Sequence, residues 1–232
     1  PTLQQPWYFE KAYSLAVDSQ GYVYVNSTAT RTVSKFTSDG HFVRQWKFGT
    51  VETPIGVRIG SNDKLYVLYQ RDYDVVVFVG VFNAAGEVIK EWGEINQPTD
   101  GSFVYDLRPE TLAVGKNAQD NREDEVYLFN RYISDGVGTI SVNYPILQKF
   151  TWDGQLTGRW SLEDKPVKPD WHLFLAIDSH NHIYVLYKND NRLVKYEIDD
   201  HNQLKKMQEW GVFNKPNDIA VDSQGNVYVN DT

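Results

Sequence analysis

The sequence predicts an all-β fold of the β-propeller class, built from four-stranded antiparallel blades. Two observations support this prediction: a phrase that recurs along the chain, and four short β-prone runs within each copy. The clearest copies of the phrase are LAVDSQGYVYV at 15–25 and IAVDSQGNVYV at 219–229. A sequence repeat with a period of about 20 to 50 residues is typical of proteins that stack copies of one supersecondary unit.

Five copies of the phrase can be aligned on their first apolar residue. They start at Leu15, Val57, Leu112, Leu175 and Ile219, with spacings of 42, 55, 63 and 44 residues. The longer spacings contain insertions rich in Gly, Asp and Asn, which are loop formers. We therefore expect one propeller domain over 1–232, with repeats near 12–49, 54–93, 109–161, 172–211 and 216–232.

The first copy shows the four runs most clearly. They cover 14–17, 22–26, 32–36 and 42–46, and the turn signals DSQG at 18–21 and SDG at 38–40 separate them. Four such runs predict a four-stranded antiparallel meander. The first run contains the apolar triplet at 15–17, repeated at 175–177 and 219–221, which indicates a strand covered on both faces.

The fourth run of each complete copy ends in tryptophan, at Trp46, Trp92, Trp160 and Trp210. A large ring on the outer strand suits the widening gap between neighbouring blades of a propeller. A solenoid of single-turn β-coils predicts shorter repeats, and helical repeats need a 3.6-residue periodicity that is absent here.

The phrase resembles the NHL repeat. Residues 216–231 carry the pattern, with Trp210 and Gly211 before it, and segments 35–40 and 192–196 supply the rest. The resemblance implies a ring that usually has six blades, whereas four full repeats and a partial fifth are present. We therefore expect the chain to be part of a six-bladed ring, incomplete at its C-terminus; closure by another chain, or by a degenerate strand at 3–8, are the alternatives.

Composition bears on the compartment and the partners. The 232 residues are 41% hydrophobic, contain no cysteine and carry a formal charge of −8, with basic residues dispersed. These values disfavour disorder, a disulfide framework and nucleic-acid binding. No apolar run approaches the about 18 residues of a membrane span. Two glycosylation triplets, at Asn26 and Asn230, and the residue usage favour an extracellular or periplasmic protein.

Five histidines are candidates for metal or acid–base chemistry. His41, His180, His182 and His201 fall in turns, and we expect them to be polar turn residues. His172 is different, because it precedes an inner strand. The resemblance to amidating-lyase propellers implies zinc ligands at this position from several blades, but the equivalent positions are occupied by other residues, namely Ala12, Pro54, Pro109 and Pro216. His172 is thus the sole metal candidate; no cofactor is predicted, and calcium or zinc are the ions to test.

Aspartates follow the inner runs at Asp18, Asp178 and Asp222, and glycine replaces them at Gly60 and Gly115. Calcium needs about six to eight converging oxygens, whereas one carboxylate per repeat suits an Asx turn. We therefore predict a turn role for these aspartates.

The leading hypothesis is a non-catalytic binding or scaffold propeller that recognises a protein, small molecule or glycan through its loop faces. The aromatic candidates for contact are Tyr105, Tyr132, Tyr144 and Trp171, because aromatic groups favour interfaces. A metal-dependent lyase or lactone hydrolase is the first alternative. The second is a structural subunit that self-associates through an open sheet edge, for which the β-prone run 75–82 is a candidate.

Overall fold

The computed structural model describes residues 9–71, 77–93, 111–117, 124–134, 142–162, 172–211 and 213–232. These residues form two compact units, Pro1–Asn96 and Gln97–Thr232, and each is described by itself. Among them no helix has the length and the apolar character needed to cross a membrane.

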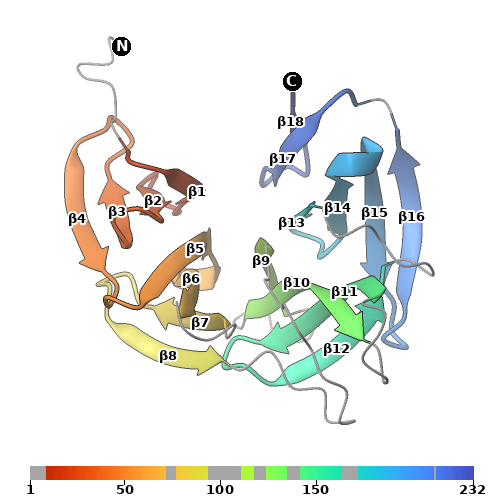
Figure 1. Ribbon diagram of the computed structural model, residues 1–232, viewed down its shortest axis with the longest axis horizontal. Coiled ribbons are helices and arrows are strands. Elements are labelled where there is room, and N and C mark those ends of the chain that lie inside the picture. The colour runs from red at the N-terminus through yellow and green to blue at the C-terminus, as the bar shows by residue number, and fades with distance from the viewer. Residues whose placement is uncertain are drawn as a thin grey trace. The chain divides into compact units, whose positions relative to one another are not determined.

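The first unit contains two four-stranded antiparallel blades (Figure 1). The first blade consists of β1 (Ala12–Val17), β2 (Val23–Ser27), β3 (Thr32–Phe36) and β4 (Phe42–Lys47). The second consists of β5 (Glu52–Ile59), β6 (Leu65–Arg71), β7 (Val77–Phe82) and β8 (Val88–Gly93), with a short 3-10 turn η1 (Ser61–Asp63) after β5. Consecutive strands pair in order, as a meander requires.

The second unit contains two further blades and a two-stranded sheet. The third blade consists of β9 (Thr111–Lys116), β10 (Asp124–Ser134), β11 (Val142–Thr151) and β12 (Leu156–Ser161). The fourth consists of β13 (Leu173–Ile177), β14 (Ile183–Tyr187), β15 (Arg192–Ile198) and β16 (Leu204–Trp210), with the 3-10 turn η2 (Lys188–Asp190). The fifth repeat supplies β17 (Pro216–Val221) and β18 (Val227–Asp231).

Within each unit, the first strands of successive blades contact one another, β1 with β5, and β13 with both β9 and β17. The aligned apolar residue of each phrase lies at these contacts. Val57 is fully buried in a cluster with Ala16 and Tyr24 of the preceding blade, and Leu175 is buried in a cluster with Ala113 and Tyr127. Removing such side chains from water is the main driving force for blade packing.

The outer strands are joined to the next blade by tryptophan, as predicted. Trp46 on β4 donates its indole N–H to the carbonyl of Gly86 at 3.1 Å. Trp160 on β12 donates in the same way to Asn202 at 2.9 Å. Both acceptors occupy the same position in the turn between third and fourth strands, and both have positive φ. The repeat therefore reproduces its inter-blade contacts as well as its strands.

The predicted strands of the first copy agree with β1 to β4 within two residues at each end. The β-prone run 75–82 forms the third strand β7 from Val77 onward, and its first two residues lie outside the described part. The all-β, four-stranded propeller class is thereby confirmed.

Candidate functional site

A carboxylate closes the turn between the first and second strands in three repeats. In each, one oxygen accepts the backbone N–H groups two and four residues later, at distances of 2.9–3.0 Å. The other oxygen accepts the hydroxyl of a tyrosine six residues later. The aspartates are Asp18, Asp178 and Asp222, so the predicted turn role is confirmed; this arrangement is an Asx turn with an added tyrosine.

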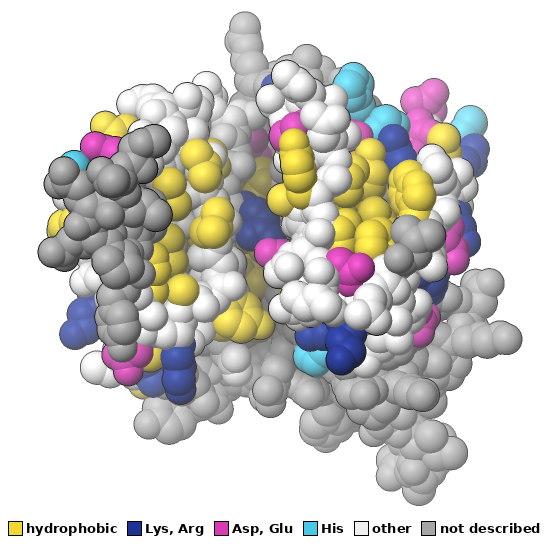
Figure 2. All heavy atoms as spheres, turned by 90° about the horizontal axis from the view of Figure 1, so that it is seen from above, with side chains coloured by type: hydrophobic (Ala, Val, Ile, Leu, Met, Phe, Trp, Pro, Cys, Tyr) yellow, Lys and Arg dark blue, Asp and Glu magenta, His cyan; other side chains and the backbone are white. Residues whose placement is uncertain are grey.

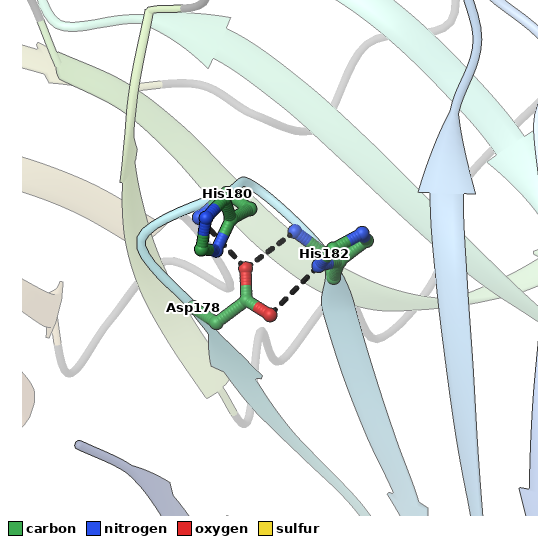
Figure 3. A group of neighbouring side chains, drawn as sticks. All are labelled: Asp178, His180 and His182. Carbon is green, nitrogen blue, oxygen red and sulfur yellow. Dashed lines mark hydrogen bonds and ion pairs between the residues drawn. The ribbon is translucent and has the colours of Figure 1, made fainter. Parts of the chain in front are cut away.

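The fourth blade adds two histidines to this turn (Figure 3). Asp178 Oδ1 accepts the backbone N–H of His180 and His182, and Asp178 Oδ2 lies 2.8 Å from His182 Nδ1. The His180 and His182 ring centroids are 6.0 Å apart. One ligand atom from each of the three side chains lies within 4.8 Å of the other two, the one such group of three among the described residues.

Burial and hydrogen bonding oppose each other at Asp178. Burial favours its neutral form, but the hydrogen bond from the His182 side chain and the two backbone N–H groups favour the charged form. The hydrogen bonds outweigh burial, so the pKa of Asp178 is lower than its usual value. Asp178 is therefore a carboxylate at neutral pH, beside two imidazoles that are at least partly exposed.

The same turn holds neighbouring blades together. Asn181, at φ 62°, accepts a hydrogen bond from the Lys116 backbone N–H at 3.0 Å and donates to the Lys116 carbonyl at 2.6 Å. In the first unit, Asp63 accepts hydrogen bonds from the backbone N–H and hydroxyl of Ser19 at 2.9 and 2.8 Å. The turn is consequently fixed on both sides, within its blade and against the preceding blade.

Sequence reasoning missed a group that pairs tyrosine, carboxylate and lysine. Tyr24 and Lys35 lie directly opposite on β2 and β3, and both hydrogen-bond to Asp18 Oδ2. The third blade has Gly115 in place of the aspartate, and there Glu125 bonds both Tyr127 and Lys149. Burial is the largest influence on the pKa of Tyr24 and raises it, as is expected of a structural hydroxyl. The sequence contains a signal for this group, because Tyr-Val recurs in the second runs and Lys followed by an aromatic residue recurs in the third runs.

The remaining predicted site residues lie near strand ends or outside the described ranges. His41 and His201 lie in turns before β4 and β16, as expected. His172 is exposed just before β13, and its carbonyl accepts the Lys188 backbone N–H at 3.1 Å. The proposed contact residues fall outside what is described: Tyr105 and Trp171 entirely, and Tyr132 and Tyr144 in their side chains, although their backbones pair across β10 and β11.

Comparisons with known proteins support the fold. No protein-family model and no curated protein matched the sequence. Among solved structures, a protein of unknown function from Bacteroides caccae is similar, with TM-score 0.59 and 12% identity over 94% of this chain and 69% of that one. A gluconolactonase from Xanthomonas campestris has TM-score 0.58 and 10% identity over 96% and 70%. A catalytically inactive virginiamycin B lyase from Staphylococcus aureus, with quinupristin, has TM-score 0.52 and 11% identity over 98% and 79%. At these identities the likeness extends to the propeller fold alone.

Proposed function

We propose that this chain is a non-catalytic binding and assembly module with NHL-type repeats, and that it associates with a further blade through an open blade face. The single observation that carries the proposal is an exposed apolar face on β1. Tyr13, Leu15 and Val17 are 61%, 61% and 53% exposed. Leu15 and Val17 alternate along the strand, so their side chains share one face, and Tyr13 precedes them at an irregularity in the pairing of β1 with β2.

Equivalent residues in other repeats are covered by the preceding blade. Leu15 aligns with Val57, Leu175 and Ile219, which are 0%, 1% and 5% exposed. Ile219 packs in a cluster with Ala176 and Tyr184 of the fourth blade. The first blade therefore presents a face that in the second, fourth and fifth repeats is covered by the preceding blade, and an apolar face of this kind marks an interaction site.

The complementary half of such an interface is also present on this chain. Tyr228 on β18 is 59% exposed, whereas its equivalents Tyr24 and Tyr184 are 2% and 4% exposed. In the described units, those tyrosines lie against the first strand of the next blade. We therefore propose that a second copy covers this face, with the first blade of one copy against the fifth repeat of another. This contact is heterologous.

Hydrophobic side chains are visible at the molecular surface in Figure 2.

Sedimentation velocity of the full chain between about 1 and 100 µM tests the proposal, since standard interfaces give micromolar or tighter affinity. We expect concentration-dependent association that Leu15→Glu abolishes, because a buried unpaired carboxylate opposes packing. The matched control is Val88→Glu, an exposed apolar residue on β8, which should associate like the wild type. A wild-type chain that sediments only as a 26.8 kDa monomer would refute self-association.

A metal-dependent lyase or lactone hydrolase is the alternative function, supported by the propeller fold that the chain shares with a lyase and a gluconolactonase. Hydrolysis of gluconolactone by the monomeric Leu15→Glu variant, stimulated by a divalent ion and reduced by His172→Gln, would favour this alternative.

A further inference from the structure

We propose that the turn from Asp178 to His182 binds a divalent transition-metal ion of the zinc class, with His180, His182 and the Asp178 carboxylate as ligands. Imidazole and carboxylate together suit zinc, copper(II) and nickel(II). This inference stands apart from the assembly proposal, because it concerns another repeat and needs no second copy.

Two of the ligand atoms are already close to the spacing of a zinc site. Ligand atoms about 2.1 Å from a tetrahedral zinc ion are separated by about 3.4 Å. His182 Nδ1 lies 2.8 Å from Asp178 Oδ2, so the two atoms move slightly apart to admit the ion. The ion takes the place of the Nδ1 proton, which moves to Nε2, so the imidazole stays neutral. His180 is exposed, and a rotation of its side chain closes the remaining gap, since all three ligand atoms lie within 4.8 Å.

The hydrogen bonds that form the turn can remain when an ion is bound. Asp178 Oδ1 keeps both backbone hydrogen bonds, and Tyr184 continues to donate to Oδ2 at 3.1 Å. In the first blade the corresponding oxygen of Asp18 accepts the Lys35 ammonium at 3.3 Å. In the fourth blade the equivalent Lys195 lies opposite Tyr184, with its ammonium 5.3 Å from the centre of that ring, and the His182 imidazole contacts the carboxylate oxygen.

The other repeats show that neither histidine is needed to build this turn. At the His182 position the fifth repeat has Asn226, whose side chain donates to Asp222 Oδ2 at 2.9 Å. At the His180 position the first and fifth repeats have Gln20 and Gln224. The Asx turn forms in those repeats without a histidine, so the pair in the fourth blade adds metal-binding chemistry to a turn that is complete without it.

Isothermal titration of the full chain with zinc chloride tests the site. We expect one Zn²⁺ per chain, and the double variant His180→Gln/His182→Asn should weaken binding by about tenfold or more. Both replacements are taken from this chain's own repeats, so the turn is retained. In long-range ¹H–¹⁵N spectra of the imidazole rings, zinc should move the His182 proton from Nδ1 to Nε2.

The matched control is His41→Gln/His201→Gln, which removes two turn histidines elsewhere. His41 also lies beside a carboxylate, with Nδ1 3.1 Å from Asp39 Oδ2, so this control separates the three-ligand group from a simple exposed pair. Equal affinity of the His180/His182 variant and the wild type would overturn the proposal. An equal loss in the control variant, or no binding by the wild type, would do the same.

Discussion

The contact of Trp46 with the next blade gives the sharpest test of how the repeats hold together. Its N–H donates to the carbonyl of Gly86 in the next blade, and its ring also stacks on Tyr24 of its own blade, with centroids 6.1 Å apart and planes at 16°. Full burial of a tryptophan is worth about 3–5 kcal/mol against alanine. Because Trp46 is half-buried, we expect Trp46→Ala to lower the free energy of unfolding by about 2–3 kcal/mol.

The conservative variant Trp46→Phe separates the two contributions. Phenylalanine keeps most of the apolar contact but lacks the indole N–H, so we expect it to cost about 1 kcal/mol, the net value of one hydrogen bond. Trp160→Phe should cost a similar amount in the second unit, since its bond to Asn202 is equivalent.

Urea unfolding followed by far-UV circular dichroism measures both variants, because the signal does not depend on tryptophan fluorescence. Hydrogen exchange on peptides from each unit assigns the transitions to the first or second unit. If Trp46→Ala lowers the free energy of unfolding by less than about 0.5 kcal/mol, the typical effect of a surface substitution, the reasoning about inter-blade packing is wrong.

Three further predictions concern turns. Gly86→Ala should lower the free energy of unfolding in urea by about 2 kcal/mol or more, because Gly86 has φ 78° and an added Cβ would lie 2.1 Å from Trp46 Nε1. Gly225→Ala is the matched control, since Gly225 has a similar φ of 83° but no atom within 4 Å of an added Cβ. It should lower the free energy of unfolding by only about 1 kcal/mol, from backbone strain. Asn181→Gly keeps the left-handed backbone but removes both bonds to the preceding blade, so urea unfolding should show a loss of about 1 kcal/mol, and an unchanged stability would contradict the contact. Hydrogen bonds hold the folded-state pKa of Asp178 below the usual value of an aspartate. Its ionisation therefore stabilises the fold above about pH 4, and this stabilisation is lost as pH falls through the folded pKa. The melting temperature should fall less between pH 6 and 3 in Asp178→Asn than in the wild type.

The sequence predicted the turn around Asp178 but not its chemistry. The Asp that follows the inner run, replaced by Gly in two copies, indicated an Asx turn, because such preferences act between residues that are near in the chain. The approach of His182 Nδ1 to Asp178 depends on side-chain rotamers, and the meeting of Tyr24 with Lys35 depends on the register between two strands. Glu125 in place of an aspartate was equally hidden, since only the fold brings its carboxylate to Tyr127.

The sequence by itself determined the repeat, the order of four strands in each blade and the positions of the turns, because alternation and turn chemistry are local properties. Burial was decided by tertiary structure alone. Leu15 and Ile219 begin nearly identical phrases, yet the first is 61% exposed and the second 5%. The strand is the same in both cases; what differs is whether a neighbouring blade covers its face, and no local pattern of residues encodes that neighbour.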